Sequence, residues 1–223
     1  MTRPPSPQDH DAAAPRTHRS RNALIVAIVV LIGLVLVAGV GAPYWRRSET
    51  RPSPSPAARL ALVGGPFSLV DPAGRATTDR DFRGRFMLIY FGYTTCPDHC
   101  PTMLMMTAGA LETLGPRARQ VQPIFISVDP ERDTPEIMGR YTRKFSRRIL
   151  GLTGSPAQIA SVEKAYGVQT LIRPTGPEAS AYVIDHPSVL YLVGPDGRFI
   201  AELQTDGGAD DLAARIGRRL PGG

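Results

Sequence analysis

Both cysteines of the 223-residue chain lie in one short stretch, FGYTTCPDHC, as Cys96 and Cys100. A thiolate is both a nucleophile and a ligand for soft metal ions. In a helix, residues four positions apart lie on the same face, and unpaired N–H groups at a helix N-terminus stabilise thiolates. The pair therefore fits three hypotheses: a structural disulfide, a redox pair and a metal site.

The spacing of the cysteines disfavours a structural disulfide but does not choose between a redox pair and a metal site. A disulfide that closes so short a loop restricts the unfolded chain little, so a structural disulfide is the weakest. Disulfide oxidoreductases usually have two residues between their cysteines, as in C-x-x-C, whereas three residues separate Cys96 from Cys100. A copper site, in turn, needs a ligand beyond two thiolates.

Residues 60–223 contain only two histidines that can supply this ligand, His99 and His186. His99 adjoins Cys100 and, in a helical turn, points away from the face that the cysteines share. We predict that it lies beside the site without binding the ion. His186 precedes Pro187, which favours extended backbone, and an apolar run. The loop that enters this run passes near the cysteine turn in a thioredoxin-like fold, so we favour His186 as third ligand.

The elements around the cysteines predict such a fold. RFMLIYFGY, residues 85–93, has the length and aromatic content of a strand buried on both faces. A segment of helical composition follows the cysteines and ends near Gly115. QPIFISVD, residues 122–129, predicts a second buried strand. The cysteines therefore lie where a central strand passes into a helix, which is the thioredoxin position.

Capping and turn signals place the remaining elements. Thr134 before a proline, and Ser155 with a capping-box glutamine, predict two helix starts. FSLVDPAGRATT predicts one hairpin, and SVLYLVG and RFIAELQ, which flank PDG, predict another before a helix at about residues 209–220. The order predicts an α/β domain over residues 60–223, with a thioredoxin-like mixed sheet between flanking helices.

An apolar segment precedes this domain. Residues 23–42 contain no charge, amide or hydroxyl, and a bilayer-spanning helix needs roughly 20 such residues. We predict a transmembrane helix over residues 23–45, which ends in an interfacial aromatic pair, after a cytoplasmic tail of residues 1–22. Residues 46–59 are rich in proline and serine and predict an extended linker.

The basic charge belongs mainly to this N-terminal part. Residues 1–60 contain 8 arginines and 3 acidic residues, whereas residues 61–223 contain 18 basic and 17 acidic residues. The domain has no basic stripe with interleaved aromatic residues, so we expect no nucleic-acid partner. The positive-inside count is equal on the two sides of the apolar segment, but acidic residues in the tail argue against a mitochondrial presequence.

Three motifs, YFGYTTCPDHCPTML, ISVDPERDTPE and DHPSVLYLVGPDGRF, resemble the Sco/SenC family of membrane-anchored copper chaperones. The resemblance extends from about Leu60 to the end of the chain. It implies that Cys96, Cys100 and His186 bind copper, as Cu(I) or Cu(II), and that Asp129 lies near the site. Two thiolates and an imidazole suit Cu(I) and accept Cu(II) with an added ligand. Structural zinc sites usually have four ligands.

The resemblance also implies a function and a location. The protein is expected to deliver copper to the CuA centre of cytochrome c oxidase subunit II, as a metallochaperone rather than an enzyme. The alternative is a thiol–disulfide reductase, with Cys96 and Cys100 as the redox pair, that keeps the cysteines of this centre reduced. Expected partners are subunit II, another periplasmic copper chaperone or thiol reductant, and the membrane. We predict a single-pass protein of the bacterial inner membrane with its domain in the periplasm. A peroxidase of thioredoxin fold remains a further alternative.

Overall fold

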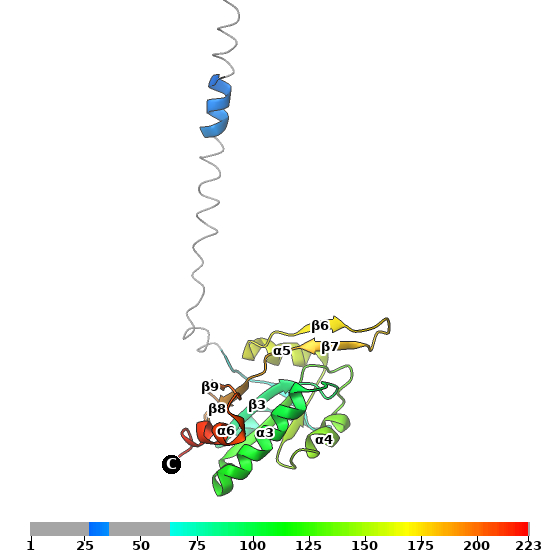
Figure 1. Cartoon of the computed structure of the whole chain (residues 1–223), viewed down its shortest axis with the longest axis vertical. Coiled ribbons are helices and arrows are strands. Elements are labelled where there is room, and N and C mark those ends of the chain that lie inside the picture. Colours follow the sequence, from blue (N-terminus) through cyan, green and yellow to red (C-terminus); the bar gives the residue numbers. More distant parts are fainter. Residues whose placement is uncertain (1–26, 36–62, 223) are drawn as a thin grey trace, which may run out of the picture. The chain divides into compact units, whose positions relative to one another are not determined.

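The computed structural model describes residues 27–35 and 63–222. They belong to two compact units, Met1–Ser55 and Pro56–Gly223, which are described separately. In the first unit, residues 27–35 are helical and exposed (Figure 1). Among the described residues, no helix has the length and apolar character needed to cross a membrane. Most of the predicted span, and all of the predicted tail and linker, lie outside the described residues.

The second unit contains a five-stranded sheet in the order β5-β4-β3-β8-β9 (Figure 1). Strands β3, β4 and β5 are parallel, and β8 and β9 are antiparallel to their neighbours. The predicted mixed α/β sheet is therefore confirmed. The strands are β3 (Phe86–Gly92), β4 (Val121–Ser127), β5 (Leu150–Leu152), β8 (Leu190–Val193) and β9 (Phe199–Leu203).

Helices cover both faces of this sheet. The ring of Phe125 on β4 packs against Tyr141 of α4, whereas the ring of Phe91 on β3 packs against Tyr166 of α5. Helix α3 packs along α6. The helices of this unit are α3 (His99–Leu114), α4 (Pro135–Arg143), α5 (Pro156–Tyr166) and α6 (Gly208–Gly217), with short 3-10 turns η1 (Asp79–Phe82) and η2 (Gly115–Gln120). The predicted capping box of Ser155 is formed.

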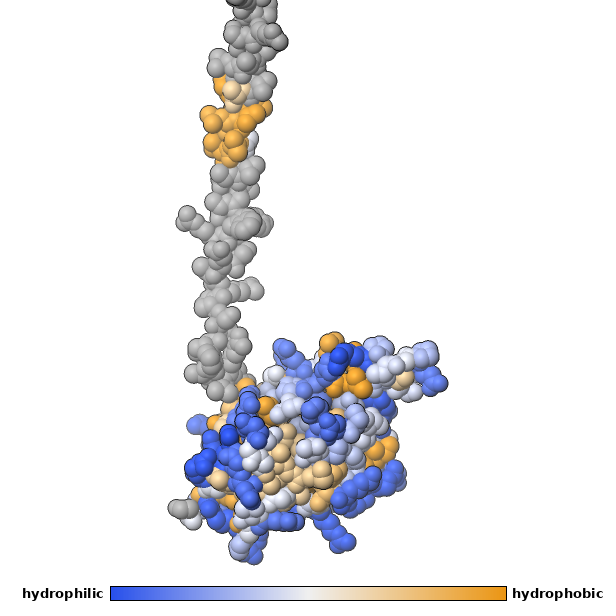
Figure 2. All heavy atoms as spheres, in the orientation of Figure 1, coloured by the Kyte–Doolittle hydropathy of each residue, from blue (hydrophilic) through white to orange (hydrophobic). Residues whose placement is uncertain are grey.

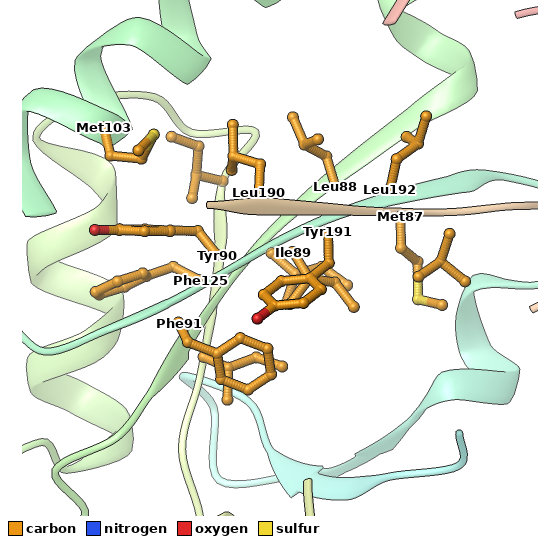
Figure 3. Packing of buried hydrophobic residues seen from close by; sticks show 14 of the residues in the cluster. Met87, Leu88, Ile89, Tyr90, Phe91, Met103, Phe125, Leu190, Tyr191 and Leu192 are labelled. Carbon is orange, nitrogen blue, oxygen red and sulfur yellow. The ribbon is translucent and has the colours of Figure 1, made fainter. Parts of the chain in front are cut away.

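Strand β3 lies at the centre of the core, and all seven of its residues are buried. Figure 3 shows that its side chains alternate between two apolar layers: Leu88 lies with Leu192 on one side of the sheet, and Met87 lies on the other with Tyr191. This double burial explains the continuous apolar run in the sequence. It also gives the cysteine turn, which follows β3 directly, a rigid base.

Two hairpins flank the sheet. The predicted first hairpin is formed by β1 (Ser68–Val70) and β2 (Ala76–Thr78). The other hairpin consists of β6 (Leu171–Pro174) and β7 (Tyr182–Asp185). It is not one of the two hairpins predicted from the sequence, and it extends away from the sheet (Figure 1). All of β6 is exposed, and Figure 2 shows hydrophobic and hydrophilic residues together over this hairpin. Strand β7 runs directly into His186, so the hairpin determines where that residue lies.

Candidate metal centre

The three predicted ligands meet at the carboxyl end of β3. The sulfur atoms of Cys96 and Cys100 and a ring nitrogen of His186 all lie within 4.8 Å of one another. The Cys100 Sγ atom is 3.4 Å from Nε2 of His186, although 86 positions separate the two residues in the sequence. The fold thus brings together two thiols from one turn and an imidazole from the end of a distant hairpin.

Cys96 and Cys100 do not share one helix. Helix α3 begins at His99, and Cys96 lies in the turn before it. The reason is Pro97, because a residue before proline is disfavoured in the helical region. The N-cap, Asp98, makes no side-chain capping bond. The Cys100 backbone N–H instead donates to the Cys96 Sγ atom at 3.5 Å, so this sulfur occupies the place of a capping acceptor.

Cys100 is fully buried beneath this turn. The Tyr90 hydroxyl donates to its Sγ atom at 3.8 Å, and burial raises the pKa of the thiol well above its ordinary value. Gly92 makes room for the sulfur: a Cβ atom at this position would lie 2.7 Å from Cys100 Sγ and 2.8 Å from the Phe125 ring. Without a bound ion, Cys100 is therefore a protonated thiol, and ion binding must release its proton.

His186 is held between two aromatic rings. Its ring centroid is 5.8 Å from that of Tyr90 and 5.9 Å from that of Tyr93, and both contacts are edge-on. The Nδ1 atom lies 3.1 Å from the carbonyl oxygen of Pro187, which can only accept. A proton on Nδ1 leaves the lone pair on Nε2, the atom nearest Cys100. Burial also lowers the pKa of the imidazole, which favours the neutral form that binds metals.

Asp133 supports the cysteine turn, and the sequence analysis did not single it out. This fully buried carboxylate accepts hydrogen bonds from the Thr94 backbone N–H at 3.1 Å, from the Thr94 hydroxyl and from the Ser127 hydroxyl at 2.7 Å. Burial raises the pKa of Asp133. A second aspartate in ISVDPERDTPE was the only sequence signal, and it carried no indication that its partner is Thr94, 39 positions away.

Asp129 supports the other side of the site. Its buried carboxylate accepts a hydrogen bond from the Tyr182 hydroxyl at 2.8 Å and forms an ion pair with Arg132. The Arg132 guanidinium lies 3.7 Å from the centroid of the Tyr182 ring, and it donates to the carbonyl oxygens of Ser180 and Tyr182 at 3.2 Å. Asp129 is thus linked to the site through the start of β7 and is not one of the three grouped ligands.

His99 is the first residue of α3 and is exposed. It lines a cavity of ≈ 430 Å³ together with Cys96 and His186, so it lies beside the three ligands. Arg173 and Asp185 from the second hairpin line the same cavity and form an ion pair with each other at 2.7 Å. The half-buried Cys96 is therefore the sulfur that a second molecule reaches first.

The donor set is chemically selective. Two thiolates and one imidazole are soft and borderline ligands that suit copper, and a half-open site leaves a position for a ligand from a partner. No carboxylate belongs to the group, which disfavours magnesium and calcium. The geometry is consistent with a site that binds one soft ion and can release it.

The SCO1/SenC family matches residues 55–220. This chain belongs to that family. It is 34% identical to the mitochondrial SCO1 homologue of Homo sapiens over 230 residues, which cover 98% of this chain and 74% of the relative. It is 42% identical to the mitochondrial SCO2 homologue of Bos taurus over 167 residues, 74% of this chain but only 62% of the relative.

A solved structure of a family member connects this fold with copper. The structure of ScoI from Bradyrhizobium japonicum with copper bound is 43% identical and has a TM-score of 0.66. The match covers 71% of this chain and 99% of that chain. Almost the whole of that structure therefore corresponds to one part of this chain, and residues 56–223 form a compact unit.

Proposed function

We propose that this protein is a copper chaperone that delivers copper to the CuA centre of cytochrome c oxidase subunit II during oxidase assembly. The general part of this proposal is that the protein binds copper. It is supported by family membership, by the copper-bound relative and by the grouped Cys96, Cys100 and His186. The observation that carries the proposal is this group of three, because a redox pair alone needs no imidazole.

The difference in exposure between the two cysteines gives a route for transfer. An incoming ligand reaches the ion from the side of Cys96, which is half-buried, while Cys100 and His186 still hold it from below. Ligands can then be exchanged one at a time, so that the ion is never free in solution. A partner whose own copper site contains cysteines matches this exchange, because it replaces thiolate by thiolate.

The test is direct transfer between purified proteins. The reduced domain, loaded with copper, is mixed with the reduced, metal-free CuA domain of subunit II, and the CuA absorption bands are recorded. We expect the bands to appear with the wild-type domain and not with Cys100→Ala. Equal rates from the domain and from free copper at the same concentration would contradict a chaperone role.

A thiol–disulfide reductase is the second candidate, and the arrangement of the sulfurs favours it specifically. The thiolate of Cys96 attacks a disulfide in the partner, which forms a mixed disulfide and releases one partner thiol. Cys100 then attacks Cys96, which releases the second partner thiol and leaves a Cys96–Cys100 disulfide. Two electrons pass to the partner, and an external thiol reductant must restore the pair. Reduction of an oxidised, copper-free CuA domain by the His186→Ala variant would isolate this activity.

The predicted location remains part of the proposal. The apolar segment of residues 23–42 favours a single membrane anchor, and the domain must share a compartment with subunit II to reach its copper site. We therefore place the protein in the bacterial inner membrane with residues 60–223 in the periplasm. Reporter fusions at the two ends of the chain, one active only in the cytoplasm and one only in the periplasm, test this orientation.

A further inference from the structure

A second cavity, remote from the cysteines, is lined by five arginines. Its volume is ≈ 510 Å³, and none of the described residues that line it is acidic. The arginines come from the start of β3, from η2 and from the segment that includes the end of α4 and leads to β5: Arg85, Arg119, Arg143, Arg147 and Arg148. We call the cavity that these five residues line the arginine cavity.

These arginines lack anionic partners within the described residues. None of the five lies within salt-bridge distance of a carboxylate, although eight other ion pairs are formed in the same domain. Their hydrogen bonds to protein go to neutral oxygens: Arg85 donates to the Gln122 side chain at 2.9 Å, and Arg148 donates to the Ala118 carbonyl. The cavity is thus a concentrated positive charge that no carboxylate of residues 63–222 neutralises.

The distribution of charge in the domain makes this cluster unusual. Residues 61–223 contain 18 basic and 17 acidic residues, so a random arrangement would mix the two signs. Instead, five cations surround one cavity without an anion. Guanidinium groups bind phosphate oxygens through paired N–H donors, and several around one concavity can surround a single phosphate.

The position of the cavity fixes its relation to the metal centre. Gln122, Ile149 and Leu150, which line it, lie at the amino ends of β4 and β5, and Arg85 directly precedes β3. Cys96, Cys100 and His186 lie beyond the carboxyl end of β3. The two sites therefore occupy opposite ends of the parallel strands, so a ligand in the arginine cavity leaves the metal centre open.

We propose that the arginine cavity binds the phosphate groups of anionic phospholipid headgroups. The choice of lipid over free phosphate rests on the membrane anchor proposed above, which keeps the domain next to a bilayer surface. Charge complementarity supplies the attraction between the arginines and the anionic surface. A domain bound in this way turns the amino ends of its parallel strands to the headgroups and presents its thiolates to partners away from the bilayer.

The test uses the domain without its anchor, residues 56–223, so that any vesicle binding comes from the domain itself. Partitioning is measured by sedimentation with phosphatidylcholine vesicles that do or do not contain phosphatidylglycerol. The triple variant R143Q/R147Q/R148Q is compared with R80Q/R218Q/R219Q, which removes the same charge from exposed arginines outside the cavity. We expect binding only to the anionic vesicles, a loss on the order of 100-fold for the first variant and at most a few-fold loss for the second.

Three results would overturn the proposal. Equal losses in both triple variants would indicate a general effect of net charge. Equal binding to both kinds of vesicle would exclude recognition of the anionic headgroup. Inorganic phosphate would instead be the ligand of the cavity if it bound saturably without lipid and also displaced the domain from vesicles at constant ionic strength. Copper binding is measured in the same variants, and we expect it to be unchanged, so that this inference and the chaperone proposal fail independently.

A single substitution covers the case in which the triple variant does not fold. Arg147 is exposed and makes no hydrogen bond to protein within the described residues, so Arg147→Gln is expected to leave the fold intact. Its partitioning to anionic vesicles should fall about fivefold. No change in Arg147→Gln, with circular dichroism identical to that of the wild type, would contradict the proposal.

Discussion

The two segments that supply the proposed metal ligands are held in place in different ways. The cysteine turn follows a strand that is buried along its whole length, and it is held by the buried carboxylate of Asp133. His186 follows a two-stranded hairpin that extends away from the sheet, and contacts of Asp129 and Arg132 with Tyr182 hold the turn end of this hairpin. The thiols therefore belong to the core, and the imidazole belongs to an appended element.

This difference predicts how the site fails when each side is disturbed. Changes under the cysteine turn act on the core and should reduce stability and metal affinity together. Changes at the contacts that hold the hairpin should reduce metal affinity with little effect on global stability, because few core contacts depend on the hairpin. The following predictions test this contrast, from the largest expected effect to the smallest.

Gly92→Ala should have the largest effect. The added Cβ would lie 2.7 Å from Cys100 Sγ and 2.8 Å from the ring of Phe125, and neither neighbour can move without disturbing the core. We expect the free energy of unfolding to fall by about 2–3 kcal/mol, as measured by denaturant titration of the reduced domain. Gly217→Ala is the control, because a Cβ there meets its nearest neighbour at an ordinary 3.5 Å. Equal stability of the two variants would contradict the packing argument.

Asp133→Ala should come next. It removes the acceptor of the half-buried Thr94 backbone N–H and of the Ser127 hydroxyl, which lies in the interior. We expect a loss of roughly 1–3 kcal/mol in the free energy of unfolding, together with weaker metal binding. Asp81→Ala removes a carboxylate of the exposed η1 turn and should cost less. Normal stability with weakened metal binding in Asp133→Ala would show that the turn is not part of the core.

Tyr182→Phe tests the hairpin. It removes the hydroxyl that donates to Asp129 at 2.8 Å and keeps the ring beneath Arg132. The hydrogen bond contributes about 1 kcal/mol. We expect metal affinity to fall about 10-fold and amide hydrogen exchange in β7 to accelerate, while exchange in β3 stays unchanged. Faster exchange throughout the domain would contradict the independence of the hairpin.

The pH dependence of stability should give the smallest effect. Burial lowers the pKa of His186 in the folded domain, so below the ordinary value of 6.5 the unfolded chain binds more protons there. The stabilising contribution is therefore present above pH 6.5 and is lost as the pH falls through the folded pKa. In the metal-free domain, we expect stability to fall slightly more between pH 7 and about pH 5 in the wild type than in His186→Asn. Identical pH profiles would contradict the burial of the imidazole.

The contrast also explains what the sequence could predict. The run FMLIYFG and the spacing of Cys96 and Cys100 are local patterns, and they predicted β3, the turn and the helix after it. Helix α3 begins at His99, just before Cys100, because Pro97 disfavours helical backbone at Cys96. His186 was favoured as the third ligand because an apolar run follows it. In a thioredoxin-like fold, the loop that enters this run passes near the cysteine turn.

The parts that were missed depend on contacts between distant segments. Strands β6 (LIRP) and β7 (YVID) have only four residues each and show no clear alternation of apolar and polar residues, and the apolar residues of β6 are exposed. Strand β5 has only three residues. The partners of Asp129 and Asp133 lie 53 and 39 positions away, in Tyr182 and Thr94, so their roles follow only from the fold.

The central claim is that Cys96, Cys100 and His186 form one copper site, and a copper titration of the reduced domain tests it most directly. Wild-type domain and His186→Ala are titrated with Cu(I) against a competing chelator, and with Cu(II) while the sulfur-to-copper charge-transfer bands are recorded. We predict one copper ion per domain in the wild type, and in the variant an affinity loss greater than the 10–100-fold typical of residues that only orient ligands, with shifted bands. Unchanged affinity and spectrum in His186→Ala would contradict the three-ligand site.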